Sequence, residues 1–105
     1  MKRVVIESPY AGNKELNVLY LERCIKDCLR RGEAPFASHG FYTQYLNDDD
    51  PRERTQGIRA GFAWGAVAEL VAVYQDHGIT PGMKAGITRA QNAGIPVVYR
   101  GVGLE

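Results

Sequence analysis

Apolar residues in this chain fall in short runs that alternate with longer segments of helical spacing. The β-branched run Val4-Val5-Ile6 predicts a buried strand over residues 2–7, and the almost continuously apolar residues 68–74 predict a second, fully covered strand. Residues 34–37 and 95–99 predict two shorter strands. Each of these carries a proline, which favours the edge of a sheet or the first paired position.

Three segments between the strands show the spacing of amphipathic helices. Residues 14–31 place apolar side chains on one face, and Asn13 before them is a natural N-cap. A second helix is predicted from Pro51 to about residue 64, with Asp50 as its N-cap. Thr80 and the proline after it predict the start of a third helix, which Gly94 closes.

The resulting order of strands and helices predicts an α/β fold. With right-handed crossovers it gives a small doubly wound domain, Rossmann-like or flavodoxin-like, with three main helices and a four-stranded parallel sheet in the order 2-1-3-4. The chain has 105 residues, so one domain over residues 1–103 is expected. Leu104-Glu105 is consistent with an expression-vector remnant.

Charge and composition exclude several classes of partner. Thirteen Lys and Arg against twelve Asp and Glu give a formal net charge of +1, which argues against nucleic acid or an anionic membrane as the main partner. No apolar run is long enough to span a bilayer, so the cytoplasm is the expected compartment. Cys24 and Cys28 are expected to be buried reduced thiols, and the acidic residues 48–50 to serve helix capping and solvation rather than a metal.

Glycines recur every fourth residue in the second predicted helix, at positions 57, 61 and 65. Each interior glycine costs about 0.5–1 kcal/mol relative to alanine, so a stripe of them implies that something approaches the helix closely. A neighbouring helix is the first interpretation of this stripe. A second subunit and a ligand are the alternatives.

In a doubly wound sheet the ligand crevice lies beyond the carboxyl ends of the strands, where the winding direction reverses. This rule predicts a site between residues 8–13, after the first strand, and residues 75–82, after the third. The two loops offer hydroxyl, aromatic and amide groups, glycines that allow close approach, and the free N–H groups of a helix N-terminus that suit an anion. The candidate ligand-binding residues are Ser8, Pro9, Gly12, Asn13, His39, His77, Gly78, Thr80, Gly82 and Met83.

Candidate catalytic residues come from the same region. Asp76 ends a buried strand, and a role in capping the following turn competes with a catalytic or ribose-binding one. Glu7, beside Ser8, is a possible acid or base, and Tyr10 is a stacking platform. His39 and His77 also lie near strand ends. For each of them a functional role competes with the ordinary interpretation of a solvated loop histidine. The chain lacks the GxGxxG and Walker signatures, and neither a cofactor nor a metal is expected.

The chain resembles the nucleoside 2-deoxyribosyltransferase-like superfamily, in particular its small nucleotide N-glycosidase branch. The residues that carry the resemblance are Ser8-Pro9-Tyr10-Ala11-Gly12, the stretch 69–78 and Gly82-Met83-Lys84-Ala85-Gly86-Ile87, with Ala90, Gly94, Ile95 and Pro96 beyond. The resemblance implies a homodimer or larger homo-oligomer with a pocket for a nucleoside or nucleotide. It also implies that an aspartate assists the base, at Asp76, while a glutamate attacks the anomeric carbon of the sugar.

One position departs from the pattern of that superfamily. Where the resemblance places the attacking glutamate, this chain has Gly86, and glycine cannot form a glycosyl-enzyme intermediate. Either another acid substitutes, with Asp76 and Glu7 the nearest candidates, or the pocket binds a nucleotide without cleaving it. A structural, homo-oligomeric interaction protein is the third hypothesis.

Overall fold

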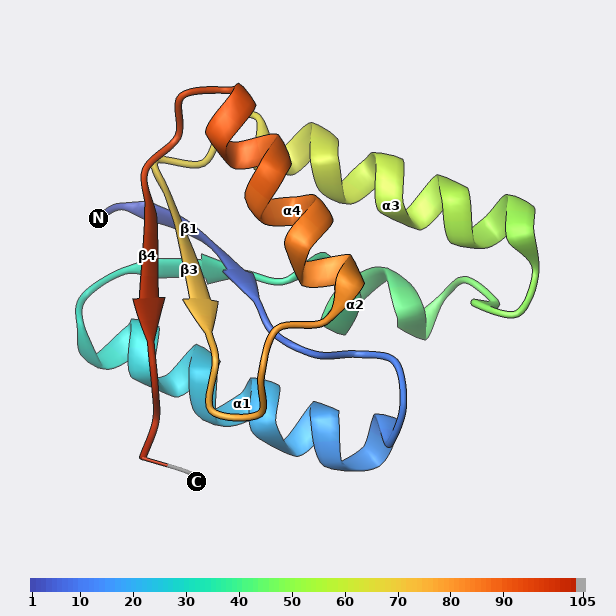
Figure 1. Cartoon of the computed structure of the whole chain (residues 1–105), viewed down its shortest axis with the longest axis horizontal. Helices are drawn as coiled ribbons and strands as arrows, with labels where there is room; N and C mark the ends of the chain where they lie inside the picture. Colours follow the sequence, from blue (N-terminus) through green and yellow to red (C-terminus); the bar gives the residue numbers. More distant parts are fainter. Residues whose placement is uncertain (104–105) are drawn as a thin grey trace.

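The computed structural model describes residues 1–103, so the interpretation of residues 104–105 lies outside the described part. Four parallel strands form one sheet in the order β2-β1-β3-β4, which confirms the predicted α/β topology (Figure 1). The elements in chain order are β1 (Arg3–Glu7), α1 (Lys14–Arg30), β2 (Ala34–Phe36), α2 (Ser38–Phe41), a 3-10 turn η1 (Tyr42–Gln44), α3 (Pro51–Gly65), β3 (Leu70–Tyr74), α4 (Pro81–Asn92) and β4 (Val97–Arg100).

The long helices begin where the capping residues predict. The side chains of Asn13, Asp50 and Thr80 accept hydrogen bonds from backbone N–H groups in the first turns of α1, α3 and α4. Asp50 of the acidic triplet therefore caps a helix, as expected, because it satisfies the N–H of Arg52. Proline follows the cap of both α3 and α4, where a missing N–H costs no hydrogen bond.

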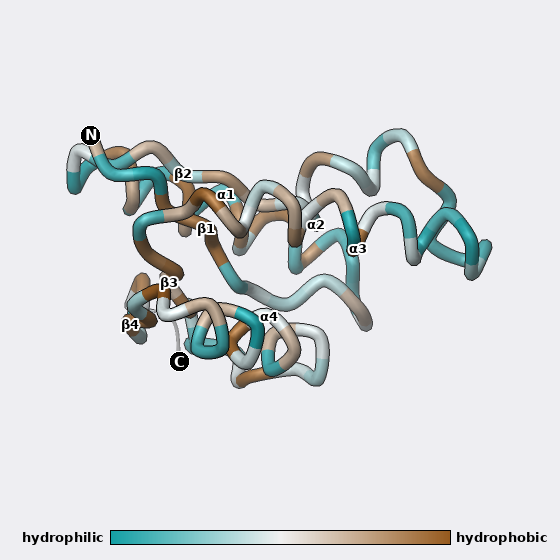
Figure 2. The backbone as a smooth tube through the Cα atoms, turned by 90° about the horizontal axis from the view of Figure 1, so that it is seen from above, coloured by the Kyte–Doolittle hydropathy of each residue, from teal (hydrophilic) through white to brown (hydrophobic). Residues whose placement is uncertain are grey.

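The alternation of side chains along the strands divides the core into two layers. Val4 and Ile6 of β1 face α1, whereas Val5 packs with Val71 and Val73 of β3 against α4. Figure 2 shows these apolar strands between α1 and α4. Because successive strand residues point to opposite faces, Glu7 shares the face of Val5 rather than that of Ile6.

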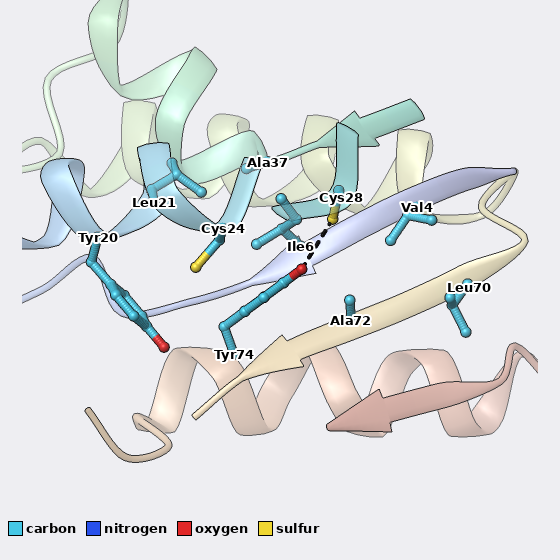
Figure 3. Packing of buried hydrophobic residues seen from close by; sticks show 10 residues of the cluster. All are labelled: Val4, Ile6, Tyr20, Leu21, Cys24, Cys28, Ala37, Leu70, Ala72 and Tyr74. Carbon is cyan, nitrogen blue, oxygen red and sulfur yellow. Dashed lines mark hydrogen bonds between the residues drawn. The ribbon is translucent and has the colours of Figure 1, made fainter. Parts of the chain in front are cut away.

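The layer under α1 contains both cysteines and two buried tyrosines (Figure 3). Cys24 and Cys28 are buried and free, as the sequence predicts. The hydroxyl of Tyr74 lies 3.3 Å from the sulfur of Cys28 and donates to Asp27 at 2.7 Å. These polar atoms are therefore satisfied inside the layer.

The strand bounds differ slightly from the predicted ones because helix ends extend into the predicted runs. The N–H of Ala68 closes a turn on Gly65, so β3 begins at Leu70. In the same way the N–H of Ile95 bonds to the carbonyl of Ala90, and β4 begins at Val97. The short helix α2 and the turn η1 occupy the segment after β2, where no helix was predicted.

The glycine stripe of α3 contacts other parts of the same chain. A Cβ at Gly61 would lie 2.6 Å from the Ser38 hydroxyl of α2, and a Cβ at Gly65 would lie 2.6 Å from the Arg89 guanidinium carbon of α4. These contacts agree with the first interpretation of the stripe, close packing against neighbouring helices. No helix within residues 1–103 is long and apolar enough to cross a membrane.

Candidate functional site

A cavity of about 380 Å³ opens above the carboxyl end of β1, between α3 and α4. Its floor is the end of β1 and the loop after it. One wall is α3 with the α2–η1 segment, and the other is the first three turns of α4. The volume lies within the range of small-molecule sites, and such sites occur at this edge of doubly wound sheets.

The Glu7 carboxylate lies against the backbone of α4 at Gly86. A Cβ built at position 86 would overlap both carboxylate oxygens of Glu7 and their carbon, so no larger residue fits there unless Glu7 moves. Gly86 is buried, and both residues line the cavity. Thus a carboxylate from β1 occupies the space that a side chain at position 86 of α4 would fill.

Burial controls the ionisation of Glu7. Loss of hydration raises the pKa of its carboxyl group from an ordinary value of 4.5 to about 7, although the positive charge of Arg89 partly opposes the change. A carboxyl group with a pKa near 7 exchanges its proton readily at neutral pH. This property is typical of acids and bases in active sites.

Ser8 and His39 form a hydrogen-bonded pair beside Glu7. The Ser8 hydroxyl lies 2.7 Å from Nε2 of His39, and the backbone carbonyl of His39 accepts from the Thr43 hydroxyl at 2.6 Å. Burial lowers the pKa of His39 to about 4, so the imidazole is neutral at pH 7. The pair offers hydroxyl and imidazole groups to a ligand without adding charge.

Tyr10 and Ala11 form the rim of the cavity in the loop after β1. The Asn17 side chain of α1 donates to both of their carbonyl groups at 3.0 Å, which fixes the loop. Lys14 lies over the Tyr10 ring, with its nitrogen 5.2 Å from the ring centre. The loop therefore presents Tyr10 at the rim of the cavity from a hydrogen-bonded backbone.

The start of α4 contributes Thr80, Gly82 and Met83 to the cavity. The Thr80 hydroxyl accepts from the N–H of Met83 at 3.2 Å, so one of the N–H groups predicted to suit an anion is already bound. Glu7, Ser8, Tyr10 and His39 line the same cavity. The structure thus brings together seven of the predicted site residues.

Asp76 lies outside this group. Its carboxylate accepts a 2.6 Å hydrogen bond from the Tyr20 hydroxyl and 3.0 Å bonds from the N–H of Val102. The contact with Tyr20, in α1, places it on the opposite face of the sheet from Glu7. Tyr20 also packs edge-on against the His77 ring, with ring centres 4.5 Å apart. The catalytic role of Asp76 remains a prediction, and the observed contacts are those of a residue that anchors a turn.

The other predicted ligand residues are also absent from the cavity lining: Pro9, Gly12, Asn13, His77 and Gly78. Conversely, Arg54, Phe62 and Arg89 line the cavity, and the sequence interpretation did not select them. They come from the helices α3 and α4 rather than from the strand-end loops. Arg89 lies one helical turn after Gly86, and this spacing is the sequence signal that could have placed Arg89 on the cavity side of α4.

The described residues contain no group of three or more His, Cys, Asp or Glu side chains suited to a metal ion.

Comparison with known proteins identifies the fold. The family model described as "Domain of unknown function (DUF7768)" matches residues 2–100. No curated protein matches the chain in sequence. A 2-deoxyribosyltransferase from Bacillus psychrosaccharolyticus superimposes with a TM-score of 0.67 at 15% identity, over 94% of this chain and 72% of that one.

A CMP N-glycosidase from Clostridium botulinum gives a TM-score of 0.58 at 17% identity, over 95% of this chain and 71% of that one. The chain therefore has the fold of the nucleoside 2-deoxyribosyltransferase-like superfamily, as its sequence motifs predict.

Proposed function

The chain belongs to the DUF7768 family, and from its fold and cavity we propose that it cleaves the N-glycosidic bond of a nucleoside or nucleoside monophosphate. The observation that carries this proposal is the Glu7 carboxylate against Gly86. It supplies an acidic group at the place where the resemblance expects a glutamate from α4. Binding of a nucleotide without cleavage is the alternative outcome.

Glu7 is the proposed nucleophile. Its ionised carboxylate attacks the anomeric carbon, the bond between sugar and base breaks, and the electron pair leaves with the base, which takes up a proton. Water then hydrolyses the glycosyl ester and restores the carboxyl group. Ser8 and neutral His39 provide hydrogen-bonding groups for the sugar, and Tyr10 a ring on which the base stacks.

The raised pKa of Glu7 gives this mechanism a pH dependence. Only the ionised carboxylate is a nucleophile, so kcat/KM is expected to rise with pH and level off above about pH 7. A rise of kcat/KM centred near pH 4.5 would instead indicate a solvated carboxyl group.

The direct test measures release of free base from a panel of nucleosides and their 5′-monophosphates by chromatography. We expect Glu7→Gln to lower the rate by roughly 10²–10⁴-fold, because the amide is neither nucleophile nor base. Glu22→Gln, at an exposed position of α1, is the matched control and should leave the rate unchanged. No release of base from any compound would refute the enzymatic proposal.

A double substitution tests whether the position of the carboxylate matters. Gly86→Glu alone should displace Glu7 and reduce activity, because the two side chains compete for one space. In the variant Glu7→Ala/Gly86→Glu the carboxylate comes from α4 instead, so activity should partly return relative to Glu7→Ala. If the double variant is no better than Glu7→Ala, a carboxylate from α4 does not replace the one from β1.

A further inference from the structure

The guanidinium of Arg89 lies against α3. Helices α3 and α4 approach each other at the end of α3 that carries Gly65 (Figure 1). There the guanidinium carbon lies 2.6 Å from the point where a Cβ at Gly65 would be, and 5.3 Å from the centre of the Phe62 ring. Because the missing side chain makes room and the face of a ring attracts a cation, α3 fixes where this half-buried charge lies.

Arg89 also covers the turn of α4 that carries Gly86. In an α-helix a side chain leans toward the N-terminus and lies over the preceding turn. Arg89 follows Gly86 by three residues, so its stem passes over the turn against which the Glu7 carboxylate lies. Arg89 and Glu7 line the same cavity. The positive charge is therefore near the proposed nucleophile.

The two groups do not form a direct ion pair. Among residues 1–103, no nitrogen of Arg89 lies within 4.0 Å of a carboxylate oxygen. Burial raises the pKa of Glu7, and the charge of Arg89 partly opposes that rise across the longer separation. A direct pair would engage the carboxylate oxygens in hydrogen bonds, whereas a guanidinium held on α3 leaves them available to attack.

Five other groups that can titrate line the cavity: Tyr10, His39, Asp48, Glu53 and Arg54. Their effect on Glu7 is small, because the causes of its raised pKa are burial and Arg89. The imidazole of His39 is neutral at pH 7. Arg54 lies in the first turn of α3, eleven residues before Gly65, which corresponds to roughly 16 Å along the helix axis. Arg89 is therefore the cation that acts on Glu7.

We propose that Arg89 is a positioning residue for the reaction, because it holds a positive charge near Glu7 without binding it and so keeps the carboxylate ionised and free to attack. This inference rests on the proposed N-glycosidic activity. In the first step the carboxylate becomes a neutral ester, so Arg89 acts on the free nucleophile. In the second step the oxygen of water bonds to the anomeric carbon and the carboxylate leaves, and the same charge favours its release.

A titration of the Glu7 carboxyl group tests the inference without turnover. Carbon NMR of protein labelled at the glutamate carboxyl carbons follows the titration, and the resonance lost in Glu7→Gln belongs to Glu7. We expect Arg89→Met to raise the pKa of Glu7 by roughly one pKa unit above its native value of about 7. Arg89→Lys keeps the charge and should stay closer to the native value. In an active protein the low-pH limb of kcat/KM should move by the same amount as the pKa.

Two further variants separate the effect of charge from a packing defect. Arg89→Gln is a second neutral variant and should raise the pKa of Glu7 as Arg89→Met does. Arg59→Met removes an exposed arginine of α3 and should leave that pKa unchanged. A pKa that stays near 7 in both neutral variants, or that rises as much in Arg89→Lys, would overturn the role of Arg89. A raised pKa in a protein that releases no base would instead refute only the proposed reaction.

Discussion

The ionisation of Glu7 predicts a specific dependence of stability on pH. In the unfolded chain this carboxyl group has its ordinary pKa of 4.5, whereas burial raises the pKa in the folded protein to about 7. Folding therefore favours the protonated form. The free energy of unfolding has its full value below pH 4.5 and falls as pH rises through 7, because the native state then has to hold a buried anion.

The structure sets the size of this effect. One pKa unit corresponds to about 1.36 kcal/mol, so the difference between 4.5 and about 7 is worth on the order of 3 kcal/mol. Glu7→Gln removes the charge at every pH and keeps the shape of the side chain. We expect the variant to match the native protein near pH 4 and to be more stable by about that amount at pH 8, which corresponds to a rise in Tm on the order of 10 °C.

Urea unfolding followed by the fluorescence of Trp64, at several pH values between 4 and 8.5, measures the difference directly. Every other titrating group is common to the two proteins, so subtraction isolates Glu7. Glu22→Gln serves as the control, and its stability difference should stay flat and small. A difference between Glu7→Gln and the native protein that does not grow with pH would refute the burial argument, and with it the case for Glu7 as a tuned catalytic group.

Three further predictions concern His39, the glycine stripe of α3 and a buried ion pair under α1. Burial lowers the pKa of His39 from 6.5 to about 4 in the folded protein, so the free energy of unfolding falls as pH drops from 6.5 toward 4. His39→Asn should make this fall smaller, which acid unfolding curves of the two proteins measure. Gly61→Ala should lower the free energy of unfolding by roughly 1–3 kcal/mol in urea titrations, since its Cβ would meet the Ser38 side chain; an unchanged midpoint would contradict tight packing. Arg100 donates two hydrogen bonds to the Glu33 carboxylate, at 2.7 and 2.8 Å, and the Glu33 side chain is only 12% exposed. Arg100→Met should therefore lower the free energy of unfolding by roughly 3–5 kcal/mol, because it leaves a buried carboxylate without its partner. A cost below about 1 kcal/mol would show that water replaces Arg100 at Glu33.

The sequence predicted the fold well because its signals are local. Strand runs, capping residues such as Asn13 and Thr80, and the alternation of elements are each contained in a few consecutive residues, and the right-handed crossover rule converts them into one strand order. The short helix α2 escaped prediction because its segment lacks an apolar period.

The candidate site could be predicted only in part. The loop after β1 and the start of α4 were expected and do line the cavity. Asp76 was expected beside them, but its carboxylate bonds to Tyr20 on the α1 side of the sheet. A turn residue at a strand end can point to either face, and no local pattern decides which.

The sequence by itself determined the order of elements, the doubly wound sheet and the edge at which a ligand site should form, because periodicity and capping act over a few neighbouring residues. Only the tertiary structure decided which acid and which cation lie at the cavity. Glu7 meets Gly86, and Arg89 meets Gly65, across the packing of strands and helices that are distant in sequence. Such contacts depend on how closely whole elements approach, and a missing side chain in one element matters only when another element brings a group to fill its place.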